Sequence, residues 1–211
     1  MLENLMVRRK DGTGLFAPLT LGVGPGSFAS VMGPSGVGKS TLLDAVGGHL
    51  GHGFHCEGRV VLDGRDVTAL PPEARRIGIV FQDAALFPHL SVGDNLAFGL
   101  RRDLRGREAR RATVNAALDQ AGLSGMAARD PASLSGGQRA RAALMRTLLA
   151  EPGALLLDEP FSALDAGLRA EMRGFTHAQV TRLGIPCLLV THDHADAEAV
   201  GGICVNLSPF A

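Results

Sequence analysis

The chain has 211 residues, of which 45% are hydrophobic, and its 21 basic and 21 acidic residues give a formal net charge of zero. Such a length and apolar content suit one globular domain, or one domain carrying an inserted lobe, and the balanced charge favours neither nucleic acid nor an anionic membrane as a partner. The three cysteines, Cys56, Cys187 and Cys204, are odd in number and widely spaced, which argues against a disulfide framework and a zinc site and fits a reducing cytoplasm.

The N-terminal part predicts antiparallel strands joined by turns. Leu19, Leu21 and Val23 alternate with small or polar residues before a Gly-Pro-Gly turn at 24–26. The opening MLENLMVRRKDGTG lacks the apolar core of a signal peptide, and no apolar run approaches the roughly 18 residues of a membrane span. If this protein works at a membrane, we expect it there as a peripheral subunit.

Four apolar runs of strand length alternate with longer segments of helical spacing, which predicts an α/β core with a largely parallel sheet. These runs are Phe28–Met32, Ile77–Phe81, Ala154–Leu157 and Pro186–Val190.

A helical lobe is predicted in the middle of the chain. Strand signals disappear between Gln82 and about Glu151, and residues 109–121 have the pattern of an amphipathic helix. We therefore expect one domain, with a core formed by about residues 1–82 and 152–211 and a helical lobe inserted at about 83–151.

The sequence GPSGVGKS at residues 33–40 follows a predicted strand and opens a predicted helix, which is the setting of the P-loop motif. Its glycines allow backbone N–H groups to converge on phosphate oxygens, and the helix start adds positive potential. Lys39 is one of only two lysines in the chain, the other being Lys10; its compact ammonium suits the position between two phosphates better than an arginine fork. A glycine-rich turn without a ligand is the disfavoured alternative.

The residues that this motif places around the phosphates of ATP are Gly33, Pro34, Ser35, Gly36, Val37, Gly38, Lys39, Ser40 and Thr41. The hydroxyl of Ser40 is expected to bind Mg²⁺.

Two acids follow the fully apolar run at 154–157. Parallel strands end at one edge of a sheet, so Asp158 and Glu159 should emerge beside the P-loop. Asp158 is expected to hold Mg²⁺ directly or through water, and Glu159 to polarise the attacking water as a general base. The alternative is a strand that merely ends in solvated acids.

A third motif, LSGGQ at residues 134–138, completes a resemblance to the ATP-binding cassette (ABC) ATPases that covers essentially the whole chain. Ser135 can cap a helix whose first N–H groups Gly136 and Gly137 leave uncovered, which makes a second anion-binding helix start. The resemblance implies a P-loop ATPase fold with an N-terminal antiparallel β subdomain. It also implies that Ser135, Gly136, Gly137 and Gln138 bind the γ-phosphate held by a second copy of the chain, so that the active enzyme is a head-to-tail dimer.

Three further positions take roles from the same resemblance. Gln82 is expected to contact Mg²⁺ or the attacking water and to report the γ-phosphate to the lobe. His192 is expected to hydrogen-bond the γ-phosphate and to act together with Glu159. Asp165 resembles an aspartate at the dimer contact.

Three patterns invite other interpretations. The spacing of His49, His52, His55 and Cys56, and that of His192, His194 and Asp196, resembles metal-ligand clusters. Intervening glycines favour a surface turn for the first, and the family pattern already explains His192. The arginine-rich stretch 101–111 is interrupted by acids, which favours a solvated helical face over nucleic-acid binding.

The segment 81–100, FQDAALFPHLSVGDNLAFGL, resembles bacterial importer ATPases for ferric iron, polyamines, thiamine, sulfate or molybdate. In such proteins the lobe receives a short helix of the permease. Phe87, Leu90 and Val92 could serve that contact or the lobe's own core.

The sequence departs from this importer pattern in three places. The adenine-stacking aromatic is missing, since the chain has neither Tyr nor Trp, and Arg8 or Arg9 takes that position; an arginine plane can stack on a base. Ser27 stands where the family has a glutamate. Only 19 residues follow His192, so a short form without a regulatory C-terminal domain is expected.

We therefore expect the ATP-hydrolysing subunit of a multi-component importer. It would be peripheral at the cytoplasmic face of the cell membrane, dimeric, bound to permease subunits and indirectly served by a solute-binding protein. Two alternatives remain open: a cassette that drives a non-transport envelope complex, and a soluble cassette in DNA repair or translation. The presence of Lys39, Asp158, Glu159 and His192 disfavours a non-catalytic cassette.

Overall fold

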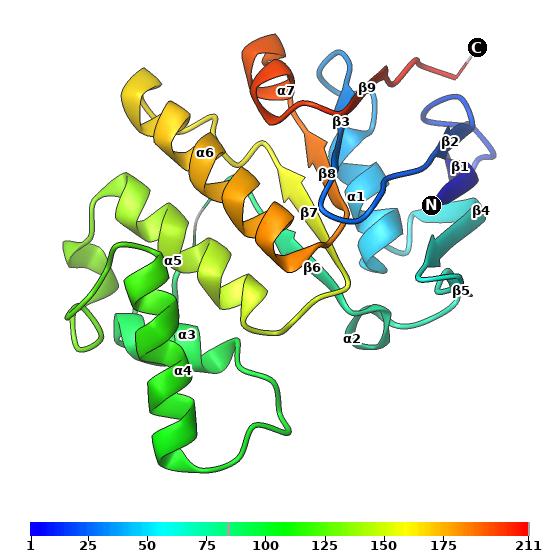
Figure 1. Cartoon of the computed structure of the whole chain (residues 1–211). Helices are drawn as coiled ribbons and strands as arrows, with labels where there is room; N and C mark the ends of the chain where they lie inside the picture. Colours follow the sequence, from blue (N-terminus) through cyan, green and yellow to red (C-terminus); the bar gives the residue numbers. More distant parts are fainter. Residues whose placement is uncertain (84, 211) are drawn as a thin grey trace. The chain divides into compact units, whose positions relative to one another are not determined.

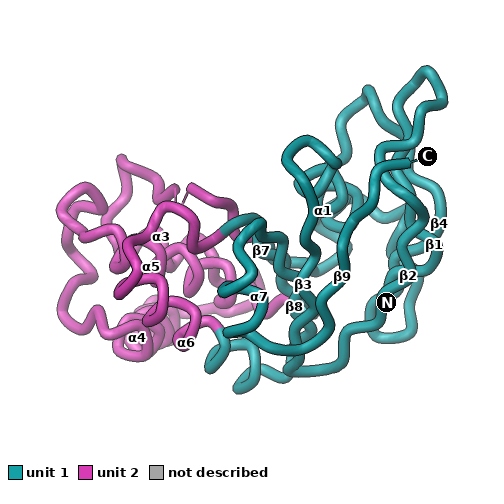
Figure 2. The backbone as a smooth tube through the Cα atoms, turned by 90° about the horizontal axis from the view of Figure 1, so that it is seen from above, with its two compact units in different colours: residues 1–79, 153–159, 177–211 teal, residues 80–152, 160–176 magenta. Residues whose placement is uncertain are grey.

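A computed structural model describes residues 1–83 and 85–210. The chain divides into two compact units (Figure 2). Unit 1 comprises residues 1–79, 153–159 and 177–211, and unit 2 comprises residues 80–152 and 160–176. The expected lobe, 83–151, lies within unit 2, which also takes in the segment 160–176. Ala84 and Ala211 lie outside the described residues.

The first sheet of unit 1 is antiparallel, with strand order β2-β1-β4-β5 (Figure 1). The alternation at Leu19 and Leu21 therefore did indicate a strand, although the longest strands of this sheet are β1 and β4. The strands are β1 (Leu2–Arg9), β2 (Leu19–Leu21), β4 (Phe54–Leu62) and β5 (Arg65–Asp66).

The second sheet has the order β6-β7-β8-β3-β9, and its pairs β7/β8, β8/β3 and β3/β9 are parallel, as predicted. The four predicted apolar runs correspond to four of its strands; the edge strand β9 was not predicted. The strands are β3 (Phe28–Met32), β6 (Ile77–Val80), β7 (Ala154–Asp158), β8 (Cys187–Val190) and β9 (Ile203–Asn206).

The helix α1 (Lys39–Gly47) packs between the two sheets (Figure 1). Its Leu42, at 0% exposure, joins residues of both sheets in one apolar core. The buried Arg75, in the short helix α2 (Pro72–Arg75), closes the other end of α1 by donating to the carbonyls of Ala45 (2.7 Å) and Val46 (2.8 Å). The P-loop therefore leads into a helix that is packed on both sheets and whose last carbonyls are hydrogen-bonded.

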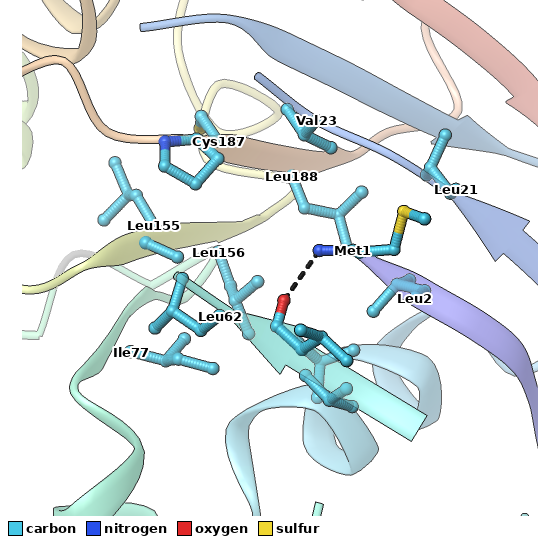
Figure 3. A pocket seen from close by; sticks show the side chains of 15 residues that line it. Met1, Leu2, Leu21, Val23, Leu62, Ile77, Leu155, Leu156, Cys187 and Leu188 are labelled. Atoms are coloured by element: carbon cyan, nitrogen blue, oxygen red, sulfur yellow. Dashed lines mark hydrogen bonds between the residues drawn. The ribbon is translucent and has the colours of Figure 1, made fainter. Parts of the chain in front are cut away.

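A small apolar pocket of about 50 Å³ lies in unit 1 beside this core (Figure 3). Leu2 and Leu21 of the first sheet face Leu155 and Leu188 of the second across it, and the Met1 amine donates to the Val61 carbonyl at 2.8 Å. No charged side chain lines the pocket. Because binding sites combine apolar walls with a few placed polar groups, we interpret this space as a packing defect.

Unit 2 is helical in its described residues from 85 to 151. The helix predicted at 109–121 is α4, and its Val114, Ala117 and Leu118 are buried as the spacing requires, whereas Ala112 is exposed. The elements are α3 (Val92–Phe98), α4 (Arg107–Gln120), the 3-10 turn η1 (Pro131–Ser133), α5 (Gly136–Leu148) and the first part of α6 (Ala166–Leu183). The last described helix, α7 (His194–Val200), belongs to unit 1.

Among residues 1–83 and 85–210, no helix combines the length and the apolar character that crossing a bilayer requires.

Candidate nucleotide site

The P-loop forms an open cradle at the end of β3. Gly33, Gly36 and Gly38 have φ values of 151°, 80° and 104°, which favour glycine. Gly38 is the N-cap of α1, and no side chain caps this helix start. A Cβ on Gly38 would lie 3.2 Å from the Phe16 ring and one on Gly33 only 2.9 Å from the Leu207 carbonyl. The loop therefore has its phosphate-binding shape because the surrounding backbone enforces it.

Lys39 starts α1 and is only 8% exposed. Its ammonium donates to the carbonyls of Gly33 (2.9 Å) and Pro34 (3.1 Å), both in its own loop. A buried charge needs such partners. The lysine thus both braces the loop and holds a positive charge over it.

The metal ligands expected from the sequence, Ser40 and Asp158, are neighbours at the end of β7. Burial raises the pKa of the Asp158 carboxyl, and the neighbouring Glu159 adds to this, while Ser40 and Lys39 act in the opposite direction. A hydroxyl and a carboxylate beside a phosphate cradle are hard oxygen donors of the kind Mg²⁺ prefers. The donor set therefore fits Mg²⁺.

A second pair of side chains at the site is formed by Glu159 and His192. His192 Nδ1 lies 3.0 Å from Glu159 Oε1, and the two side chains are 61% and 21% exposed. Strand register explains the meeting, because Asp158 pairs with Val190 on β8 and Val190 with Val31 on β3. Parallel strands β7, β8 and β3 therefore end together, and the residues that follow them share one edge.

Glu159 also has an unusual backbone. Its φ of 44° is left-handed, which non-glycine residues rarely adopt. Its N–H donates to the Val190 carbonyl at 2.9 Å, so the β7/β8 ladder holds it in place. Local strain of this kind persists where the surrounding structure enforces it, and it concentrates at functional sites.

Two supporting residues were not predicted. Thr191, 1% exposed, donates to the carboxylate of Asp196, 2% exposed, at 3.1 Å, and its hydroxyl accepts from the N–H of Asp193 at 3.1 Å. This buried bond fixes the turn that carries His192. It also separates the residues of the second suspected metal cluster, because Asp196 bonds Thr191 while His192 pairs with Glu159. The adjoining Thr-His-Asp sequence was the available signal.

The histidines of the first suspected cluster, His49, His52 and His55, are all exposed. Within the described residues, His, Cys, Asp and Glu side chains form no group of three or more suited to a metal ion.

The signature residues lie in unit 2, where α5 begins with a capping box. The Ser135 hydroxyl accepts from the Gln138 N–H at 3.3 Å, and Gln138 Oε1 accepts from the Ser135 N–H at 3.0 Å. Gly137 is buried, and a Cβ there would lie 2.3 Å from Leu168. A Cβ on Gly136 would have its nearest neighbour 4.0 Å away, whereas Gly137 is required for the close packing of Leu168.

The remaining predicted residues also lie in unit 2. Gln82 is exposed at the start of the segment 82–91. Asp165 accepts from the Leu168 N–H at 3.0 Å and so caps α6, a structural task beside the predicted one. The arginine stretch 101–111 is helical only from Arg107, and Arg101 pairs with Asp103 and Glu151.

The importer-like segment has a core side and an exposed side. Val92 is 0% exposed and belongs to the core of unit 2, while Phe87 and Leu90 are partly exposed. Phe98, 69% exposed, meets Phe87 edge-on with ring centroids 4.8 Å apart. Asn95, unpredicted and fully buried, holds this loop by hydrogen bonds to the N–H and carbonyl of Phe87 at 2.7 and 3.1 Å.

Comparison with known proteins gives the family. A family model described as "ABC transporter" matches residues 16–162. An uncharacterized ABC transporter ATP-binding protein of Escherichia coli K12, YnjD, is 49% identical over 94% of this chain and 90% of its own length. The thiamine import ATP-binding protein ThiQ of a Jannaschia species is 48% identical over 93% of this chain and 83% of its own length.

Some relatives are longer than the match. The spermidine/putrescine import ATP-binding protein PotA of Frankia alni is 51% identical over 84% of this chain, which spans only 37% of PotA.

A solved structure agrees with the sequence relatives. The dimeric structure of a post-hydrolysis state of the ATP-binding cassette MJ0796 bound to ADP and Pi has a TM-score of 0.80 and 30% identity, covering 98% of this chain and 93% of that one. With an open P-loop, an acidic strand end and an ABC family match over most of its length, the chain belongs to the ABC transporter family as an ATP-binding and ATP-hydrolysing subunit.

Proposed function

We propose that this protein powers the uptake of a solute, as the ATPase subunit of a multi-component importer. The observation that carries the proposal is the constellation at one sheet edge in unit 1: the open P-loop, the Ser40–Asp158 pair and the Glu159–His192 pair at 3.0 Å. Several relatives are named as import ATP-binding proteins for thiamine, spermidine/putrescine, sulfate/thiosulfate and ferric ions. The choice of solute would belong to the binding protein and the permease, not to this subunit.

Each residue of the edge has a chemical task. The N–H groups of residues 33–41 and the Lys39 ammonium bind the phosphates of ATP. Ser40 and Asp158 would hold Mg²⁺, with Gln82 as a further ligand, and such an ion would supply positive charge beside the phosphates. Glu159 accepts a proton from the attacking water, and His192 orients the Glu159 carboxylate while donating toward the γ-phosphate.

A second copy of the chain completes the site. Ser135, Gly136, Gly137 and Gln138 of one copy bind the γ-phosphate held by the P-loop of the other, as the dimeric arrangement of the cassette neighbour supports. ATP closes the dimer and hydrolysis reopens it, and the lobe passes this motion to the permease.

The exposed Phe87–Phe98 pair is the proposed contact with the permease. Arg146 lies 5.0 Å from the Phe87 ring centroid and Asn95 holds the Phe87 backbone, while Phe98 stands at the end of helix α3. Exposed aromatic side chains of this kind are typical of protein interfaces. The protein would work at the cytoplasmic face of the cell membrane, beneath permease subunits that a solute-binding protein supplies.

The test of the catalytic assignment is Glu159→Gln. This variant should bind ATP and form a dimer, yet its turnover should fall by about 10²- to 10⁴-fold, because the general base is lost while the phosphate contacts remain. Phosphate release measures the turnover, and light scattering measures the formation of the dimer. Glu198→Gln, which changes an exposed carboxylate on α7 of the same unit, should keep normal turnover. Unchanged turnover of Glu159→Gln would contradict the assignment.

Transport and the two rival roles separate by partner. We expect the tagged protein to co-purify with a polytopic permease, and Phe98→Ser to weaken that association while leaving basal ATPase activity intact. Co-purification with envelope proteins that move no solute would favour the first rival, and association with nucleic acid or ribosomes the second.

A further inference from the structure

The base of a bound nucleotide needs a flat side chain to stack on. The family resemblance expects an aromatic residue for this in the N-terminal strands, but Arg8 or Arg9 takes that position. The chain has neither Tyr nor Trp, so among Phe, Tyr and Trp only its nine phenylalanines could stack on the base. In unit 1, the phenylalanines with large exposure are Phe54 at 37% and Phe210 at 40%.

Phe210 lies in a segment tied to the P-loop. After β9 the chain runs back toward the first sheet (Figure 1). Leu207 donates its N–H to the Met32 carbonyl at 2.7 Å, directly before the P-loop, and its own carbonyl closes over Gly33. An extended chain covers three residues in about 10 Å, so Phe210 is within nucleotide length of the phosphate cradle.

The same segment is paired with the loop that follows β1. The Ala17 N–H donates to the Ser208 carbonyl at 3.1 Å, and Phe16 and Pro209 form an antiparallel bridge. Phe16 is itself fully buried and contacts the other end of the P-loop at Gly38. Both sides of the cradle therefore connect to the backbone that carries Phe210.

Arg8 lies over one face of the Phe210 ring. Its guanidinium carbon lies 5.1 Å from the ring centroid, within cation–π distance. The guanidinium is held in turn, since Nε donates to Glu57 Oε1 and Nη1 to the Gly12 carbonyl, both at 2.9 Å. A Cβ on Gly14 would lie 2.6 Å from the ring, so Gly14 is what allows the ring to lie so close to the backbone.

We propose that Phe210, backed by Arg8, is the base-stacking residue of the nucleotide site. The arginine at the expected position then serves beneath the ring, and the base lies on the exposed side of the phenylalanine. The inference rests on the proposed phosphate site at residues 33–41. Stacking on an aromatic face discriminates little between bases, so this contact strengthens purine nucleotides in general.

Affinity measurements test the proposal on the intact protein. Phe210→Ala should raise the Kd of ATP, and that of GTP by a similar factor, about 5- to 100-fold, the range for losing one stacked base. The Kd of inorganic tripolyphosphate, which has no base, should not change. Phe54→Ala, the other exposed phenylalanine of unit 1, is the matched control and should leave all three Kd values unchanged.

Fluorescence gives an independent test, because Phe210→Trp would introduce the only tryptophan of the chain. We expect ATP to quench its emission and tripolyphosphate to leave the emission unaltered, whereas Phe54→Trp should respond to neither.

Three results would overturn the proposal: unchanged ATP affinity in Phe210→Ala, an equal loss of tripolyphosphate affinity, or a stronger effect of Phe54→Ala. None of these results would contradict the proposed phosphate site at residues 33–41. That site is tested separately by Lys39→Met, which should weaken ATP and tripolyphosphate alike.

Discussion

The two glycine-rich helix starts of this chain, one at the P-loop and one at the signature, differ in how their N–H groups are satisfied. At α1, Gly38 is the N-cap in a left-handed conformation and no side chain caps the helix. At α5, Ser135 and Gln138 cap each other's backbone. The first start has no side-chain cap, whereas at the second the N–H groups of Ser135 and Gln138 are already bonded to each other's side chains.

This difference matches the proposed division of labour. A cradle that binds ATP first should be preformed, and its glycines are held in shape by Leu207 and Phe16. A surface that binds only when a second copy presents the γ-phosphate should be stable alone, and the capping box at Ser135 and Gln138 contributes to that stability. Four predictions test the comparison, from the largest expected effect to the smallest.

The largest effect should come from Lys39→Met, which removes the charge over the open start. Hydrogen bonds to charged groups contribute about 1.5–3 kcal/mol each, so the Kd of ATP should rise by about 10- to 100-fold, as calorimetry would measure. Lys10→Met changes the only other lysine and should bind ATP normally. Lys39→Arg should not restore affinity, because the planar fork replaces a point charge. Normal binding by Lys39→Met would show that the loop N–H groups suffice.

The next effect separates the two glycines of the capped start. Gly137→Ala forces a Cβ to within 2.3 Å of Leu168 and should lower the free energy of unfolding by about 1–3 kcal/mol. Gly136→Ala, whose nearest neighbour would be 4.0 Å away, should unfold at nearly the wild-type denaturant concentration. If Gly136→Ala nevertheless blocks ATP-dependent dimerisation, the open glycine faces the second copy; equal stability losses would contradict the packing argument.

Removing the cap of the second start should have a smaller effect. Ser135→Ala should cost about 1 kcal/mol, equivalent to a fall in Tm of about 2–4 °C for a chain of this size. Thermal unfolding followed by circular dichroism measures the change. Ser124→Ala, an exposed hydroxyl bonded to Asp119, is the control and should melt as the wild type does. A Tm unaffected by Ser135→Ala would mean that the capping box contributes nothing in solution.

The smallest effect concerns the acid beside the open start. Because burial raises the pKa of Asp158 above its unfolded value, the folded state binds the proton more tightly than the unfolded state does. That contribution to stability is present below the unfolded pKa and is lost as the pH rises through the folded pKa. Asp158→Asn should therefore raise the Tm of the nucleotide-free protein at neutral pH, by less than Ser135→Ala lowers it.

The same variant should lose the Mg²⁺ dependence of ATP binding, which the wild type should also lose as acid protonates Asp158. A lower Tm for Asp158→Asn would show that the favourable effect of Ser40 and Lys39 on the carboxylate outweighs the burial of the charge.

Local chemistry was predictable from the sequence, because the motifs that bind phosphate act through consecutive backbone groups. The strands at 28–32 and 187–190 and the helix α4 followed from apolar spacing alone, since burial on one face leaves that period in the sequence. The edge strand β9 escaped prediction, because its residues are largely exposed and an edge pairing is made by the backbone.

The sequence by itself determined where the residues proposed to bind phosphate, Mg²⁺ and a proton stand, because Lys39, Ser40, Asp158 and Glu159 belong to contiguous motifs. Only the tertiary structure decided which distant residues meet them. The Glu159–His192 pair depends on strand register, the need for Gly137 depends on Leu168 of another helix, and the position of Phe210 over Arg8 depends on a segment that returns to the first sheet. Such contacts join residues far apart in the chain, and they leave no period or spacing in the sequence because packing alone brings them together.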